Sequence, residues 1–482
     1  MAKQTSIIWK DFYWGIAQDD FLTTWKQILY AENIDLTSSS DYVSLAKDSE
    51  WRFTTTDQVN WFIDAQSGTS KDVFAYTDDG KIYDTEDWTV ESSAIWDKIY
   101  TAFKFNGYLY FVSNHPTAPF SRILESSAYN NTNWASLSVN FALWTAISTW
   151  AADIFPTLVY LDEYFYIGIG NTVYKVDDAN VVESFDIFDG DVVGLTRVWG
   201  IIKVFTDKGT IAFWDWISSA VDSVISIQEP IRWVINNWKV DFIVSWHSDF
   251  QSRIKILNGY TVQGLSNARY SERLSDYIWK ISFTDTNMLG KLWDTIYFVQ
   301  DWITWNDLFR YWTNNPVLRA WFNVALAKDS NANLITKITS IYWIEFTSVD
   351  RVRIWVDSNS QNAFEYIDIN TTSPTYKPSW YMILNPIDWW FKTIKKKIDK
   401  ITLVTSNCDA TETIEVLYSI DWWAFTSLQT INSWTSLTRT EIFSANDSFY
   451  DIQFKLNFAS SGWADTPQFY ELKLDYIEIE EK

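Results

Sequence analysis

Carboxylate pairs are the first residues in this sequence that could do chemistry, because two acids a few ångströms apart form the catalytic machinery of most glycoside hydrolases. Three adjacent pairs stand out: Asp78-Asp79, Asp162-Glu163 and Asp177-Asp178. Each pair lies between short apolar runs, where Asp is favoured because its side chain hydrogen-bonds the backbone of a turn. The pairs fit hairpin tips better than a catalytic site, so we assign no catalytic residue.

Metal ligands and nucleophiles are scarce. The chain has two histidines, His115 and His247, and one cysteine, Cys408. The histidines have no ligand at metal-binding spacing, so we expect both in solvent-facing loops. Cys408 has no His or Asn partner that the sequence places beside it, and it can form no intramolecular disulfide. Residues 357–368 resemble a calcium loop but lack its Gly and its final Glu. We therefore expect no metal and no cofactor.

The concentrated positive charge lies in residues 392–400, KTIKKKIDK. Two roles are open for it: docking an acidic partner surface, or protecting an edge strand from pairing with another chain. We favour the second, because lysines commonly block strand edges.

Composition narrows the classes of partner. The chain has 482 residues, with 38 Lys and Arg against 61 Asp and Glu, a net charge of −23. Such acidity argues against a nucleic-acid groove, which needs a basic face. The opening has no basic-then-apolar leader, and no apolar run approaches the roughly 18 residues of a membrane span. We expect neither nucleic acid nor a membrane as partner.

Tryptophan and glycine have unusual frequencies: 31 Trp and 14 Gly, where an average composition has about 34 Gly in such a length. Trp also stands where turns favour Gly, as in Asn237-Trp238 and Asp421-Trp422, because Asn-Gly and Asp-Gly turns need positive φ. Our hypothesis is that the gene uses UGA as a glycine codon, written as Trp under the standard code. The alternative is a truly Trp-rich protein that binds carbohydrate or a membrane surface. Further positions of this kind are Trp302, Trp389, Trp390, Trp423, Trp434 and Trp463.

Short alternating runs of Val, Ile, Tyr, Phe and Thr dominate the chain, with almost no helical periodicity. Hairpin patterns such as residues 73–83 and 102–112 recur at intervals of roughly 30 to 55 residues, which brackets the length of propeller blades. The sequence predicts an all-β protein with a β-propeller of about six or seven irregular blades over residues 51–372. Successive β-sandwiches built from the same hairpins are the alternative.

The polar residues 371–378, which include Pro374 and Pro378, predict a linker. After it, most strands alternate apolar with polar residues, which predicts a C-terminal β-sandwich over residues 373–482. Residues 1–50 form an N-terminal extension and are a candidate for closing the propeller.

Segments at both ends of the chain carry a resemblance. Residues 10–17, KDFYWGIA, contain DFYGGI when Trp14 is read as Gly, and residues 418–425 read YSIDWWAF. The first is similar to the start of virion structural proteins of tailed bacteriophages, and residues 395–479 are similar to their closing β-sandwich.

This resemblance implies a non-enzymatic structural protein, associated with the tail or neck and assembled into the virion in the host cytoplasm. Its partners would be other virion proteins and copies of itself. The alternative function is a propeller-type glycan-binding protein or glycosidase at a cell surface, for which the 26 Tyr and 31 Phe could line a sugar groove. More often such residues form the core of sheets.

Overall fold

The computed structural model is all-β, as predicted: the residues that it describes contain no helix, and 73% of them lie in strands. Within this part of the chain no helix is long and apolar enough to span a membrane. The described residues are 4–10, 28–31, 34–35, 42–45, 50–55, 59–67, 70–77, 79–85, 90–92, 98–105, 108–114, 121–125, 138–143, 157–161, 163–177, 181–185, 188–216, 221–236, 240–247, 251–264, 278–284, 295–302, 305–312, 321–326, 335–345, 350–358, 362–368, 376–384, 386, 394–421, 423–433, 435–442, 448–461 and 465–479.

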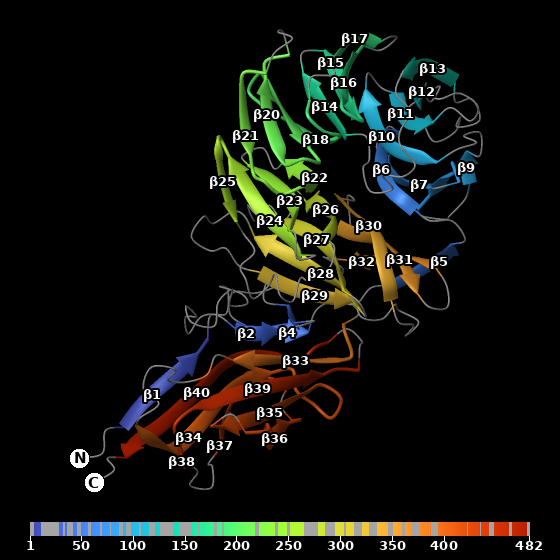
Figure 1. Cartoon of the computed structure of the whole chain (residues 1–482). Helices are drawn as coiled ribbons and strands as arrows, with labels where there is room; N and C mark the ends of the chain where they lie inside the picture. Colours follow the sequence, from blue (N-terminus) through green and yellow to red (C-terminus); the bar gives the residue numbers. More distant parts are fainter. Residues whose placement is uncertain are drawn as a thin grey trace.

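Seven antiparallel sheets of four strands make up the upper part of the molecule (Figure 1). In six of them the four strands are consecutive in the chain. In order, the sheets are β6 (Val59–Ser67), β7 (Ser70–Thr77), β8 (Ile82–Asp84), β9 (Val90–Ser92); β10 (Ile99–Phe105), β11 (Tyr108–Asn114), β12 (Ser121–Glu125), β13 (Ser138–Leu143); β14 (Thr157–Leu161), β15 (Tyr164–Ile169), β16 (Thr172–Val176), β17 (Val181–Phe185); β18 (Val192–Val198), β19 (Ile201–Thr206), β20 (Thr210–Trp214), β21 (Ser223–Ser226); β22 (Ile231–Asn236), β23 (Asp241–His247), β24 (Gln251–Asn258), β25 (Thr261–Gly264); β26 (Ile278–Thr284), β27 (Thr295–Trp302), β28 (Trp305–Trp312), β29 (Trp321–Leu326); and β30 (Ile335–Glu345), β31 (Asp350–Ser358), β32 (Asn362–Asp368), β5 (Glu50–Thr55).

Two of these sheets share the same turn between their second and third strands. In the β7–β8 turn the Thr77 hydroxyl accepts a hydrogen bond from the backbone N–H of Lys81, at 3.1 Å. In the β19–β20 turn Thr206 accepts one from Thr210, at 3.3 Å. Both turns have the sequence Thr-Asp-x-Gly, and their glycines have φ of 78° and 83°, a conformation that side chains with a Cβ disfavour. The repeated turn fixes the same hairpin geometry twice.

Neighbouring sheets contact one another mainly through their first strands: β6 with β10, β14 with β18, β18 with β22, β22 with β26, β26 with β30, and β30 with β6. The second and third sheets meet through the rings of Phe103 and Phe165, whose centroids are 4.7 Å apart. The series of contacts therefore returns to the first sheet. Strand β5, from near the N-terminus, pairs with β32 and completes the seventh sheet.

Two five-stranded sheets form the lower part of the molecule (Figure 1). Their apolar faces share one hydrophobic core, to which β39 contributes every second residue and β1 contributes the buried Trp9. One sheet consists of β1 (Gln4–Trp9), β40 (Gln468–Ile479), β34 (Lys395–Ser406), β37 (Thr438–Ile442) and β38 (Ser448–Phe449); the other consists of β2 (Ile28–Ala31), β33 (Ser379–Leu384), β39 (Ile452–Ala459), β35 (Thr413–Ile420) and β36 (Thr426–Ile431); the short strands β3 (Ile34–Asp35) and β4 (Ser44–Leu45) pair with each other.

The N-terminal residues are shared between the two parts. β1 pairs with β40 and β2 pairs with β33 in the lower sheets, whereas β5 lies in the upper part. The division into an extension over 1–50, a body over 51–372 and a C-terminal unit over 373–482 stays a prediction. Strand β5, which completes the seventh four-stranded sheet, begins at Glu50, the last residue of the expected extension.

Interpreting residues 392–400 as a guard of an edge strand is wrong. β34 is an interior strand: at Lys396 and Lys397 it pairs with β40 on one side and with β38 on the other. Lys396 is buried, and its ammonium group donates to the carbonyl oxygens of Ile394 and Tyr450, at 3.1 and 3.3 Å. Hydrogen bonds to backbone carbonyl groups therefore stabilise its buried charge, a role of lysine that a run of charges in the sequence does not reveal.

Candidate functional site

Exposed aromatic side chains gather at one end of the β18–β21 sheet. In an antiparallel sheet of this order the β18–β19 turn and the β20–β21 connection lie at the same end. Trp199 lies in the first and is 98% exposed, and Trp216 lies in the second. Tyr260, from the β24–β25 turn of the next sheet, is 63% exposed and packs against Phe213 with 4.5 Å between ring centroids. We call the following five residues the aromatic end: Tyr164, Lys175, Trp199, Trp216 and Tyr260.

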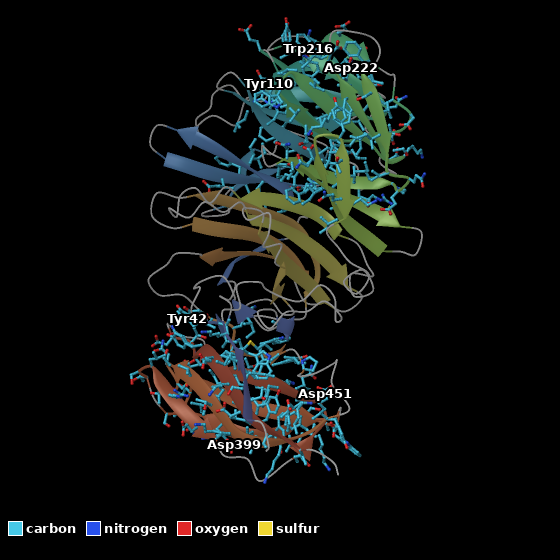
Figure 2. All side chains as sticks on the ribbon, turned by 90° about the vertical axis from the view of Figure 1, so that its left-hand side faces the viewer. Tyr42, Tyr110, Trp216, Asp222, Asp399 and Asp451 are labelled. Atoms are coloured by element: carbon cyan, nitrogen blue, oxygen red, sulfur yellow. The ribbon has the colours of Figure 1, made fainter. Side chains whose placement is uncertain are left out.

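Lys175 supplies the positive charge of the aromatic end. Its Nζ atom lies 4.3 Å from the ring centroid of Tyr164 and 4.9 Å from that of Trp216, within the range of cation–π attraction. Figure 2 shows Trp216 and Asp222 in the part of the molecule far from the C-terminal sheets. The Asp222 backbone N–H donates to the Phe213 carbonyl oxygen at 2.8 Å, which closes the β20–β21 connection. Aromatic rings beside a polar group are a typical lining of ligand sites.

The backbone at two members of the aromatic end has positive φ, a conformation that glycine adopts more readily than other residues. Trp199 and Trp216 have φ of 59° and 57°, in the left-handed region that a residue with a bulky side chain rarely occupies. Trp199 and Gly200 form the two-residue turn between Val198 and Ile201. By contrast, Trp214 does not have positive φ, is fully buried, and packs against Phe185 with 4.4 Å between ring centroids.

Three aspartates occupy the opposite end of the same sheet. The backbone N–H of Asp191 donates to Oδ1 of Asp207 at 2.9 Å, and the Thr210 hydroxyl donates to Oδ2 of Asp189 at 2.5 Å. Burial, followed by the nearby charge of Asp207, raises the pKa of Asp191. A Cβ atom at Gly190 would lie 2.2 Å from Oδ1 of Asp207. These carboxylates hold the entry of β18 and the β19–β20 turn together.

The described members of the three predicted carboxylate pairs lie at hairpin ends. Asp79 is in the β7–β8 turn, where its carboxylate accepts from Thr77 at 2.5 Å. Glu163 is exposed in the β14–β15 turn with φ of 70°, and Asp177 follows the end of β16. Their partners Asp78, Asp162 and Asp178 lie outside the described residues.

The sequence analysis considered His115, His247 and residues 357–368 as metal ligands and expected none of them to bind a metal. His115 lies outside the described residues. His247 is the last residue of β23 and pairs with Gln251, so the prediction that His247 lies in a loop is wrong. Asp357 pairs with Asn362 across the β31–β32 hairpin, so this segment is a hairpin and not a calcium loop. Across the described ranges, no group of three His, Cys, Asp or Glu side chains could hold a metal ion.

Cys408 is fully buried, and its thiol donates to the Ser406 carbonyl oxygen at 3.5 Å. Burial raises its pKa to about 11, and the charges of Asp409 and Glu412 act in the same direction, against a hydrogen bond with Thr405. The thiol is therefore protonated at neutral pH, whereas nucleophilic cysteines need the thiolate.

A buried ion pair that the sequence analysis did not identify joins two neighbouring sheets. Lys203 on β19 contacts the carboxylate of Asp241 on β23, and both side chains are almost fully buried. Asn236 also donates to Oδ1 of Asp241, at 2.6 Å. The signal in the sequence is a lone charge in each apolar run, IIKVF and VDFIV, because a charge in a buried strand needs a partner.

Comparisons with known proteins do not show a family for this chain. No known family matches the sequence, and no curated protein does. Among solved structures, the chain is similar to the computationally designed Ika8 protein, at 11% sequence identity and a TM-score of 0.38, over 69% of this chain and 96% of the designed one.

Proposed function

We propose that the seven four-stranded sheets form a seven-bladed β-propeller and that the two five-stranded sheets form a β-sandwich. The contacts that lead from each first strand to the next and return to β6 support the propeller. Strand β5 would then close it by supplying the outer strand of the last blade. The shared core of the lower sheets supports the sandwich.

We further propose that the protein is a non-enzymatic structural protein of a tailed-phage virion, associated with the tail or neck. The resemblance of its two ends to such proteins supports this function. The pairing of β1 with β40 also ties the chain's ends into one unit (Figure 1), which suits a rigid building block. Contacts with copies of itself and with other virion proteins would need no cofactor and no reaction.

The observation that carries the proposal is an uncharged open strand in a strongly acidic protein. β36 is the end strand of its sheet, and among the described residues only β35 pairs with it. Residues 422–438 contain no charged side chain, although the whole chain has a net charge of −23. Edge strands are ordinarily protected by charges or proline. The absence of charge along β36 lowers the electrostatic repulsion between two acidic copies that approach each other at this strand.

Antiparallel pairing of β36 with β36 of a second copy would form a closed two-fold contact. Thr426, Ser427, Gln429 and Thr430 are exposed there. The pairing of β36 with β35 shifts register once, at Leu428, and the other five positions pair regularly. Unpaired backbone groups along the outer edge provide the hydrogen bonds for such an addition.

A charge-swap experiment tests this contact. Gln429→Glu and Gln429→Lys each place like charges near one another in a self-paired strand, which weakens pairing. We expect each variant alone to shift sedimentation toward monomer, and an equal mixture of the two to recover the assembly. Thr440→Glu on β37, the end strand of the other sheet, serves as the control and should leave assembly unchanged. Assembly that is insensitive to all three variants, or a wild-type protein that is monomeric at every concentration, would contradict the proposal.

Glycan binding is the second candidate function, and the exposure of the Tyr260 side chain in the β24–β25 turn supports it. Loss of binding to a glycan array in Tyr260→Ala, with binding retained in the control Leu437→Ala, would support this function. Leu437 has the same exposed fraction, 63%, but lies in the C-terminal unit.

A further inference from the structure

We infer that positions 199 and 216 are glycine in the protein as its native host makes it, and that a full-length chain requires a glycine tRNA that reads UGA. This inference goes beyond the proposed function and does not depend on it. It rests on backbone geometry at two positions that composition and turn motifs did not single out.

The first step is the conformation of the backbone. Six non-glycine residues among those described have positive φ, and two of them are Trp199 and Trp216. Of the other four, Asn407 and Asp421 tolerate this region because their short side chains hydrogen-bond locally. The remaining two, Glu163 and Gln228, have exposed, flexible side chains without a ring. Tryptophan has no such compensation. Glycine has no Cβ and adopts positive φ freely.

The second step is the surroundings of the two side chains. Trp199 is 98% exposed, so packing against the protein does not offset its strained backbone. The half-buried Trp216 contacts Lys175 and the ring of Tyr166, the latter at 6.5 Å between centroids. Lys175 keeps its closer contact with Tyr164, at 4.3 Å, when residue 216 has no side chain.

The third step is a comparison with tryptophans that the fold needs. Trp9 and Trp214 are fully buried, and neither has positive φ. The Trp9 ring meets Phe454 edge to face at 5.5 Å, and the Trp214 ring meets Tyr166 at 6.0 Å. A glycine at either position would leave a large cavity in a core. The structure thus distinguishes positions that need a tryptophan side chain from positions whose backbone favours glycine, although the sequence has Trp at both.

The consequence concerns both translation and the surface. In a host that reads UGA as a stop, synthesis ends at the first such codon, so the full chain is restricted to hosts that decode UGA as glycine. In the protein as made there, the aromatic end keeps Tyr164, Lys175 and Tyr260 but has no indole ring.

The direct test is peptide mass spectrometry of the protein isolated from its native infected or producing cells, together with the codons of the gene. We expect Gly at 199 and 216, encoded by UGA, and Trp at 9 and 214, encoded by UGG. Trp at position 199 or 216, or a UGG codon at either, would overturn the inference. Protein from whole cells is used, so the result does not depend on whether the chain is found in virions.

A stability measurement gives a second test on recombinant protein with Trp codons at all four positions. Trp199→Gly and Trp216→Gly should raise the melting temperature, each by about 2–4 °C, because a strained backbone is relieved. Trp214→Gly is the matched control and should lower it strongly. A fall in melting temperature for Trp199→Gly comparable to that of the control would contradict the inference.

Discussion

Ser6 and Asp475, at opposite ends of the chain, lie directly across from each other on β1 and β40, and the Ser6 hydroxyl donates a hydrogen bond to the Asp475 carboxylate. Lys473 contacts the same carboxylate, at 2.9 Å. Burial alone would raise the pKa of Asp475, but these hydrogen bonds, with the charges of Lys473 and Lys400, lower it below its ordinary 3.8. The N-terminal strand is thereby held to the C-terminal unit by an ionised group.

Loss of this ionised group should destabilise the unit in acid. A carboxyl group whose pKa is lowered by folding stabilises the folded state above its unfolded pKa, and the stabilisation disappears as pH falls through the lower, folded value. We expect Asp475→Asn to reduce stability near neutral pH and to flatten the acid dependence of unfolding below about pH 4. Urea titrations over a pH series measure both effects. An unchanged acid limb in Asp475→Asn would contradict this role.

The variant Ser6→Ala removes this hydroxyl and should lower the free energy of unfolding by about 1 kcal/mol, the typical contribution of one hydrogen bond. Thr5→Val on the same strand is the matched control. The Thr5 hydroxyl is buried, and no described residue hydrogen-bonds it, so its removal should be neutral or stabilising. Equal destabilisation by both variants would show that the Ser6 contact has no special role.

The Lys203–Asp241 pair predicts a non-additive result. Lys203→Met leaves a buried carboxylate without its cation and should cost about 3–5 kcal/mol, whereas the double variant Lys203→Met/Asp241→Leu should recover much of this loss. The exposed pair Lys208–Asp207, at 3.6 Å with a Lys208 side chain 64% exposed, is the control, and Lys208→Ala should cost less than about 1 kcal/mol. Denaturant unfolding of the wild type, Lys203→Met, Asp241→Leu and the double variant decides the matter, and additive effects of the two single variants would argue against coupling between the sheets.

Cys408 should resist alkylation in the folded protein. Its pKa is raised to about 11 by burial, so at about pH 8, where an exposed thiol is partly ionised, it has almost no thiolate. Treatment with iodoacetamide followed by intact-mass measurement should show no adduct under native conditions and one adduct in urea. Rapid modification of the folded protein would place the thiol at the surface.

Gly209 should be intolerant of a side chain. Its φ is 83°, and a Cβ atom there would lie 2.4 Å from the Glu229 carbonyl oxygen, so Gly209→Ala combines backbone strain with a clash and should cost more than about 1 kcal/mol. Gly200 has open space around it and does not have positive φ, so Gly200→Ala should be close to neutral. Thermal unfolding compares the two.

Local patterns in the sequence predicted the secondary structure well, because alternating apolar residues and turn residues act over short distances. The strand patterns 73–76 and 81–83 became β7 and β8, with the turn at Gly80 between them. Pairings between distant segments were not predictable in this way. Nothing in a local window indicates that Ser6 lies opposite Asp475, or that β34 is an interior strand in spite of its lysines.

The positions of charged side chains were also predictable only where they depend on neighbouring residues in the sequence. Hairpin positions for Asp79 and Glu163 followed from local turn chemistry. The partnership of Lys203 with Asp241 did not, since it depends on how two sheets pack. Positive φ at Trp199 was likewise not predictable, because Trp-Gly, unlike Gly-Gly, is not a recognised turn signal.

The most direct test of the proposed virion role is to purify phage particles from cells that carry this gene and to measure the protein composition of those particles. Quantitative mass spectrometry, with antibody labelling of intact particles, would locate the chain. We predict a fixed number of copies per particle, confined to the tail or neck. Particles that assemble fully and infect without containing the chain would contradict the account.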